Sequence, residues 1–281
     1  RPFACYEEER FTRVKTSTDF RESTFRDPIF SVCEMHNKDQ IDINKFDAYL
    51  FPKHHDQSVY DIILNNIFRC YKNLGYEVDE EHIKNKSSYY DHHGSHCALA
   101  YYTSGFADKK CLVVSMDGMG DDYSAKYFLG ENGKMKYIDG IDKSRISFGM
   151  YYVMLTEFLG FQRLKDEGKI VGMSSHGDLY DDLVRMFDEV IGSIEDIKTR
   201  KIVNNDGDIF LSVYQKYFNS NGSKFYKGTY NLNCLAKAGQ YVFEKKICEV
   251  LNNLHTLYPE YDHLCLSGGV FANVKLNKVI G

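Results

Sequence analysis

Apolar residues recur at helical spacing over four stretches of the chain. These stretches cover residues 59–74, 148–159, 179–191 and 235–254. Residues three and four positions apart lie on one face of a helix, so each stretch predicts an amphipathic helix that packs against a core. The last of them is also the longest.

Short apolar runs between turn residues predict strands. The first covers residues 111–116, and two more are predicted over residues 122–129 and 134–138. The short turns between them favour a three-stranded antiparallel meander. A further strand is predicted over residues 263–266, and a helix follows it from Phe271.

The first hundred residues give a weaker pattern. Strands are predicted over residues 47–51 and 87–90, and another is already under way at Arg1, which suggests that further sequence precedes it. Glycines also recur within residues 167–177. Their spacing predicts a tight loop beside a ligand.

Composition narrows the class of protein. The chain has 281 residues, of which 43% are apolar and 27% are charged, so it can bury a sizeable core in one large domain or two lobes. A net charge of −5 without a long basic run argues against nucleic-acid binding. No apolar stretch approaches the about 20 residues that span a bilayer. The eight cysteines are scattered and no secretory signal opens the chain, which predicts reduced thiols in a cytoplasmic protein.

Two histidines lie four residues apart at the start of a predicted helix that ends near Gly105. His92 and His96 share one helix face and can point two imidazoles at one ion, whereas His93 points elsewhere. A third ligand would come from a distant segment. A capped helix start with polar histidines explains the same pattern, and both interpretations stay open.

An Asp-Gly-Met-Gly motif at residues 117–120 follows the strand at residues 111–116. Glycines let the backbone approach an anion, and their N–H groups can line a phosphate. Asp117 could bind a metal, act as a base or hold a hydroxyl group. An ordinary Asp-Gly hairpin turn is the alternative interpretation.

Ser267, Gly268 and Gly269 follow the predicted strand at residues 263–266 and open the last helix. A helix N-terminus offers unpaired N–H donors and a positive dipole end, where nucleotides often bind. A plain strand-to-helix connection is the alternative. Lys169 could neutralise phosphate, although a lysine in such a segment is more often solvated.

Together these segments predict two lobes. Residues 1–109 would carry the histidine pair, and residues 110–281 would carry the acidic glycine motif and the Gly-Gly turn. A nucleotide held between the lobes is the simplest interpretation of this layout.

The motifs, in this order, resemble the O-carbamoyltransferases of the nodulation-factor and antibiotic-tailoring family. The resemblance extends over nearly the whole chain. It is carried by residues 7–15, 92–96, 116–120, 168–173 and 266–273.

The resemblance implies an α/β fold of the two-lobed ASKHA type, which is actin-like and ribonuclease H-like. In the family, a C-terminal domain makes carbamoyl-adenylate from carbamoyl phosphate and ATP. The N-terminal domain then transfers the carbamoyl group to a hydroxyl group of a sugar or natural product. This chain would correspond to that transfer domain.

The family's functional residues match positions of this chain. His92 and His96 match the metal ligands, with Fe(II) or another divalent metal implied. Asp117 matches the acidic residue at the reaction centre. In the implied mechanism Asp117 removes or orients the acceptor's hydroxyl proton, while Gly118 and Gly120 hold the phosphate of the adenylate.

The nucleotide-binding positions match as well. Gly268, Gly269 and Asn273 match the turn and the start of the helix that hold the nucleotide. Lys15 lies in the matching segment at residues 7–15, which in the family is near the side where the substrate binds.

The chain also departs from the family pattern. The family's first strand would lie before Arg1, and its third metal ligand, an Asp, would lie beyond Gly281. His176 stands where the family usually has an aromatic residue. The adenylate-forming domain would belong to another part of the protein or to a separate chain, so we expect this chain alone to be poor at the full reaction.

Two further functions fit the same sequence. A degenerate ASKHA module could bind a nucleotide or a partner without catalysis. A metal-dependent hydrolase could use the histidine pair with an outside carboxylate, and it would bind metal tightly without needing ATP or carbamoyl phosphate.

Overall fold

The chain forms two compact units, Arg1–His92 and His93–Gly281. The computed structural model describes residues 42–52, 57–73, 75–142, 147–193 and 230–281. The boundary between the units falls at the start of one helix, whereas the sequence analysis placed a lobe boundary at residues 109 and 110. The family segment with Lys15 lies outside the described residues.

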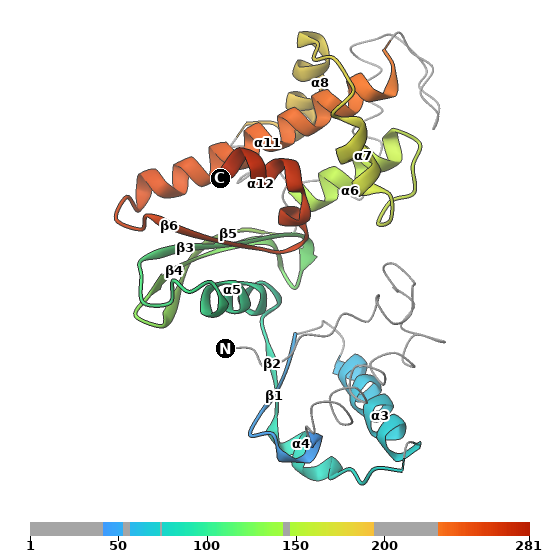
Figure 1. Cartoon of the computed structure of the whole chain (residues 1–281), viewed down its shortest axis with the longest axis vertical. Helices are drawn as coiled ribbons and strands as arrows, with labels where there is room; N and C mark the ends of the chain where they lie inside the picture. Colours follow the sequence, from blue (N-terminus) through green and yellow to red (C-terminus); the bar gives the residue numbers. More distant parts are fainter. Residues whose placement is uncertain (1–41, 53–56, 74, 143–146, 194–229) are drawn as a thin grey trace. The chain divides into compact units, whose positions relative to one another are not determined.

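The first unit contains a two-stranded parallel sheet. β1 (Tyr49–Pro52) pairs with β2 (Ser87–Tyr90). The chain runs between them through α3 (Gln57–Asn73) and α4 (Glu80–Lys86), as Figure 1 shows. Parallel strands need such a crossover because the chain must return to the same end of the sheet before it pairs again.

The strands predicted over residues 47–51 and 87–90 and the helix predicted over residues 59–74 are confirmed. The strand predicted at Arg1 lies outside the described residues. α4 was not predicted, because its seven residues include a single apolar side chain, Ile83. Ile83 is buried in a small core with aromatic and aliphatic residues of the same unit. Asp79 caps α4, since its carboxylate accepts a hydrogen bond from the backbone N–H of His82 at 2.9 Å.

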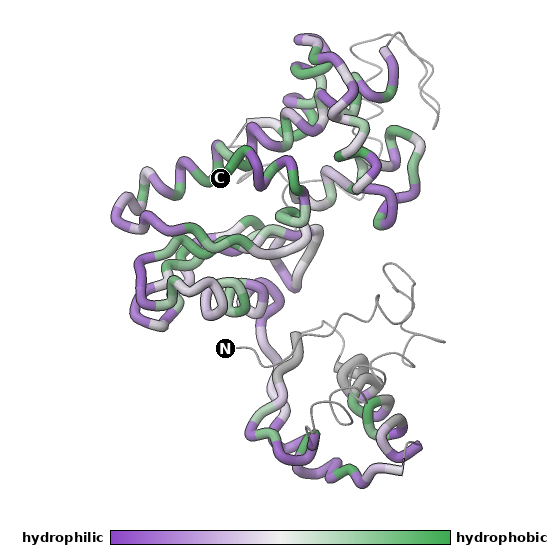
Figure 2. Tube along the Cα trace, viewed as in Figure 1, coloured by the Kyte–Doolittle hydropathy of each residue, from purple (hydrophilic) through white to green (hydrophobic). Residues whose placement is uncertain are grey.

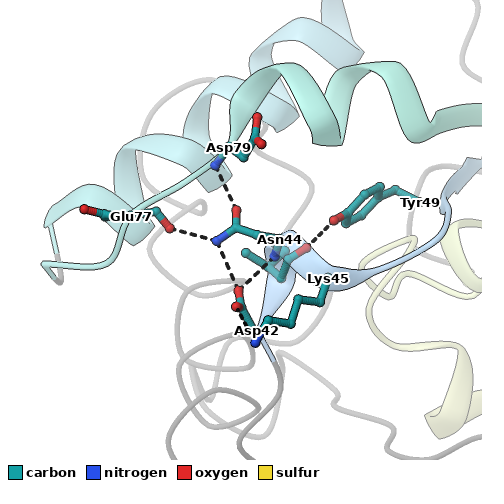
Figure 3. Close-up of polar contacts among 7 residues, drawn as sticks. Asp42, Asn44, Lys45, Tyr49, Glu77 and Asp79 are labelled. Atoms are coloured by element: carbon teal, nitrogen blue, oxygen red, sulfur yellow. Dashed lines mark hydrogen bonds and ion pairs between the residues drawn. The ribbon is translucent and has the colours of Figure 1, made fainter.

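Asn44 joins the 3₁₀ helix η2 (Ile43–Lys45) to the segment before α4 (Figure 3). Its side-chain oxygen accepts from the backbone N–H of Asp79 at 2.8 Å, and its amide donates to the carbonyl of Glu77 at 3.0 Å. Asp42 accepts from the backbone N–H of Asn44 at 3.0 Å. One side chain therefore connects segments more than thirty residues apart.

The second unit is built on a four-stranded mixed sheet in the order β5-β4-β3-β6. β3 (Cys111–Gly120), β4 (Tyr123–Glu131) and β5 (Lys134–Asp142) form the antiparallel meander that the sequence predicts. β6 (His263–Ser267) adds to β3 in parallel, with Ser115 opposite Ser267. The carboxyl ends of β3 and β6 therefore lie side by side.

Helices cover both faces of this sheet (Figure 1). On one face, Val113 packs against Cys97 and Tyr101 of α5 (His92–Thr103). On the other face, Val114 and Met116 belong to the larger core. Successive residues of a strand point to opposite faces, so β3 is buried on both sides, and Figure 2 shows it as hydrophobic along most of its length.

The larger core lies between the sheet and a layer of helices. This layer contains α6 (Phe148–Phe158), α7 (Glu167–Met173), α8 (Asp181–Ile191), α11 (Leu232–Leu257) and α12 (Val274–Ile280). Each of the helices predicted in this region is confirmed. In Figure 2, α11 alternates between hydrophobic and hydrophilic residues, as expected of an amphipathic helix.

Two local predictions are wrong. Residues 167–173 form a helix, α7, where the sequence analysis predicted a loop. The motif at residues 117–120 lies in the last part of β3, and the turn to β4 is made by Asp121 and Asp122. Asp121 has φ 55°, a left-handed conformation that Asp tolerates better than most residues.

The described part of the chain is a mixed α/β structure. None of its helices is long and apolar enough to cross a membrane.

Cys97, Cys111, Cys234, Cys248 and Cys265 are thiols that take part in no disulfide among the described residues. Burial, together with the neighbouring Cys265 thiol, raises the pKa of Cys111 from 9.0 to about 12. The folded state thus favours the protonated thiol, and this stabilisation is complete below the unfolded pKa. We expect the free energy of unfolding to fall as the pH rises from about 9 toward about 12.

Urea unfolding under reducing conditions at a series of alkaline pH values measures this dependence. The Cys111→Ala variant should lose less stability over the same range than the wild type. An equal loss of unfolding free energy in the wild type and the variant would show that Cys111 does not contribute to this pH dependence.

Candidate functional site

α5 places two imidazoles on one side of its first turn. His92 is its first residue and His96 lies one turn later. Although the boundary between the units falls after His92, the continuous helix fixes His92 relative to the rest of α5. Ligand atoms of His92, His96 and Asp117 all lie within 4.8 Å of one another, and all three residues are partly buried.

The spacing within this cluster suits a shared metal ion. His96 Nε2 lies 3.4 Å from Asp117 Oδ2. Two ligand atoms about 2.1 Å from a tetrahedral ion lie about 3.4 Å apart. Two imidazoles and a carboxylate also form a donor set that divalent transition metals accept. The predicted histidine pair and the predicted acidic residue are therefore brought together, and their chemistry fits a metal.

Asp117 lies where the pairing of β3 with β4 becomes irregular. The register between the strands shifts between Met116 and Gly120. The N–H of Gly118 donates to Asp117 Oδ1 at 2.7 Å, which orients the carboxylate so that Oδ2 faces His96. This N–H has a partner within the protein, so the predicted contact between Gly118 and a phosphate stays a prediction.

The first turn of α6 packs directly against the backbone of Asp117 and Gly118. A Cβ atom on Gly149 would lie 2.4 Å from the nitrogen of Gly118 and 2.6 Å from the carbonyl carbon of Asp117. Ser147 caps α6 by accepting from the N–H of Met150, and its hydroxyl lies 2.6 Å from the carbonyl oxygen of Gly118. Sequence reasoning missed this support, although a serine before an apolar helical run is a recognisable N-cap signal.

The Gly-Gly turn after β6 lies beside the same carboxylate. Gly268 has φ 90°, and a Cβ atom there would lie 2.2 Å from the carbonyl oxygen of Met116. A Cβ atom on Gly269 would lie 3.0 Å from Asp117 Oδ1. Because β3 and β6 are parallel neighbours, their carboxyl ends bring the Gly-Gly turn next to Asp117. Ligands commonly bind at such strand ends in α/β sheets.

Asn273 follows the 3₁₀ helix η3 (Gly269–Ala272) and caps α12. Its side-chain oxygen accepts from the N–H groups of Lys275 and Leu276, both at 3.1 Å. Its amide group also pairs with that of Gln240 on α11 through two hydrogen bonds of 3.0 Å. The structure gives Asn273 a role in fixing the start of α12, and its predicted contact with a nucleotide stays a prediction.

The segment beyond the Gly-Gly turn is positively charged. Lys275 donates to the hydroxyl oxygen of Ser174 at 2.8 Å. Desolvation lowers the pKa of Lys275, and the neighbouring charges of Lys237 and Lys278 lower it further. An anion bound nearby would counter both effects.

Lys169 does not need a phosphate to balance its charge. Its ammonium group lies 2.9 Å from a carboxylate oxygen of Asp166, one turn earlier. The side chain of Lys169 is also 60% exposed, which agrees with the solvated interpretation.

The chain belongs to the carbamoyltransferase family. Residues 2–281 match the family described as Carbamoyltransferase N-terminus. This match confirms the family that the sequence motifs indicated.

Three relatives are similar to this chain. Uncharacterized protein MJ1058 of Methanocaldococcus jannaschii is 30% identical over 234 residues, which cover 76% of this chain and 36% of the relative. Uncharacterized protein MJ1051 of the same organism is 27% identical over 277 residues, or 97% of this chain and 47% of the relative. Nodulation protein NolNO of Sinorhizobium fredii is 28% identical over 206 residues, which cover 73% of this chain and 28% of the relative. The chain therefore spans less than half the length of each of these relatives.

Proposed function

We propose that the protein carrying this chain transfers a carbamoyl group from carbamoyl-adenylate to a hydroxyl group of a sugar or natural product. Membership of the carbamoyltransferase family supports carbamoyl transfer. The observation that carries the proposal is the cluster of His92, His96 and Asp117 beside the Gly-Gly turn. It joins a metal-type donor set to a turn that suits a nucleotide.

In this proposal His92, His96 and Asp117 hold one divalent metal, with Fe(II) the metal that the family resemblance implies. When bound, the metal supplies Lewis-acid polarisation of a carbamoyl or phosphate oxygen. His92 and His96 contribute nitrogens from one helix face, and Asp117 contributes an oxygen from the end of β3. The metal ligand that the family has beyond residue 281 would add to these three.

The protein groups around the cluster have separate tasks. Asp117 orients or removes the proton of the acceptor hydroxyl as it attacks the carbamoyl carbon, and the adenylate leaves. Gly269 keeps the side of the turn next to Asp117 clear of a side chain, and Gly268 lets the turn pack closely against the backbone of Met116, so that the turn can offer its N–H groups to a phosphate. Ser147 and Gly149 fix the backbone that carries Asp117.

We also propose that the fold is of the ASKHA type, with the four-stranded sheet as the core of one lobe. A meander of three strands extended by a parallel fourth strand, with helices on both faces, supports this assignment. Carbamoyl-adenylate would be made from carbamoyl phosphate and ATP by an adenylate-forming domain elsewhere in the protein or in a separate chain.

The test is a transfer assay on the protein that carries this chain. It is incubated with carbamoyl phosphate, ATP, Fe(II) and a panel of sugars and hydroxylated natural products, and the products are identified by mass spectrometry. We expect one acceptor to gain the mass of a carbamoyl group only when both carbamoyl phosphate and ATP are present. Nucleotide binding without transfer to any acceptor would contradict the proposal and favour a binding module.

A further inference from the structure

His93 is fully buried at the point where α5 meets the sheet. His93, Cys97 and Tyr101 follow one another at intervals of four residues, so they form one stripe along the helix. Cys97 and Tyr101 pack into an apolar core with Val113. An imidazole therefore occupies the first position of a stripe that is otherwise packed against apolar side chains.

Both ring nitrogens of His93 have partners in the sheet. Nδ1 lies 2.8 Å from the hydroxyl oxygen of Ser115 on β3, and Nε2 lies 3.0 Å from the carbonyl oxygen of Tyr123 on β4. A backbone carbonyl can only accept, so Nε2 carries the proton in this bond. The neutral ring then accepts through Nδ1 from the hydroxyl of Ser115.

These two partners flank the irregular part of the β3–β4 pair. Ser115 lies before the register shift that separates Met116 from Gly120, and Tyr123 pairs with Gly120 after it. Asp117 lies inside this interval. His93 thus holds both ends of the irregular segment to the same turn of α5 that carries His92 and His96.

We infer that His93 is a positioning residue for the proposed metal site, and this inference rests on that part of the proposed function. Its two hydrogen bonds set the depth and rotation of the first turn of α5 relative to β3. A rotation of about 10° about the helix axis moves an atom roughly 7 Å from that axis by about 1.2 Å. A functional site tolerates displacements of only about 0.5 Å, so a rotation of that size would misplace the metal ligands.

The matched variants are Ser115→Ala and Ser174→Ala. Ser115 and Ser174 are both fully buried, and each hydroxyl is hydrogen-bonded, but Ser174 contacts Val171 and Lys275 in the helical layer. Ser115→Ala removes one partner of His93 and keeps the imidazole, which makes it a gentler change than His93→Leu. Co(II) affinity, the visible spectrum of bound Co(II) and the thermal midpoint of the metal-free chain are measured for each variant.

We expect Ser115→Ala to weaken Co(II) binding by about 10-fold or more and to alter the spectrum. Ser174→Ala should keep the affinity and spectrum of the wild type, even if both variants lower the thermal midpoint. Equal Co(II) affinity in the two variants would overturn the role of His93 while leaving the metal site in place. If the wild-type protein that carries this chain binds no Co(II), the metal site itself is overturned, and this inference with it.

A second measurement needs no metal. The nitrogen-15 imidazole spectrum of the metal-free chain should show His93 as a neutral ring with its proton on Nε2. A ring without a proton on Nε2 would contradict the hydrogen bond to Tyr123 on which the inference depends.

Discussion

Replacing Asp117 with Asn should abolish carbamoyl transfer by the protein that carries this chain, while leaving the fold intact. Asn keeps an oxygen that can accept from the N–H of Gly118, so the local backbone should survive. It loses the negative charge that pairs with a metal and the basicity that takes a proton. We expect the rate of transfer to fall by at least about 100-fold, since general-base catalysis alone contributes that much.

Asp139→Asn is the matched control. Asp139 also precedes a glycine, and its carboxylate accepts from the N–H of Gly140 at 2.8 Å, but it is exposed on β5 and belongs to no ligand cluster of the described residues. The Asp139→Asn variant should transfer carbamoyl groups at the wild-type rate. Normal turnover by Asp117→Asn would remove the role assigned to this carboxylate.

Replacing Gly149 with Ala should destabilise the chain and weaken metal binding together. The new Cβ atom would lie 2.4 Å from the nitrogen of Gly118, a backbone atom that cannot rotate away. Overpacking of this kind costs about 1–3 kcal/mol of the free energy of unfolding, and helix propensity returns about 0.5–1 kcal/mol of it. Because Asp117 precedes Gly118, the shift should also displace the carboxylate from the histidines.

Gly168→Ala is the same type of substitution, but we expect it to raise the stability of the chain where Gly149→Ala lowers it. Gly168 lies in α7 and is exposed, and an added Cβ atom would meet nothing within 4 Å. This variant should be more stable than the wild type by about 0.5–1 kcal/mol. Urea unfolding of both variants measures the difference. A Gly149→Ala chain as stable as Gly168→Ala would show that α6 does not pack against Asp117 as described.

Local patterns predicted much of the second unit. Its meander and its amphipathic helices depend on alternation and helical spacing within short segments, which the sequence displays directly. The glycine signals were less reliable. Gly168 and Gly172 suggested a loop, yet both lie on the open side of a helix, where glycine is tolerated. The Asp-Gly pair at residue 117 suggested a turn, although the strand continues through it.

The sequence predicted only in part that residues from distant segments come together in one site. Sequence motifs named the histidine pair, Asp117 and the Gly-Gly turn as parts of one site. They did not show that α5 packs on the same sheet as β3, because that contact depends on buried side chains such as Cys97 and Tyr101. Nor could they reveal the roles of His93 and Gly149. Those roles arise from contacts that exist only after distant segments have packed together.

His92, His96 and Asp117 should hold one divalent metal. Titration of the metal-free protein that carries this chain with Co(II), followed by calorimetry and visible absorption, measures this binding. We expect one bound ion per chain with a nitrogen- and oxygen-ligand spectrum, and loss of that binding in His92→Ala and His96→Ala. Equal binding by the wild type and both variants, or no binding by the wild type, would contradict it.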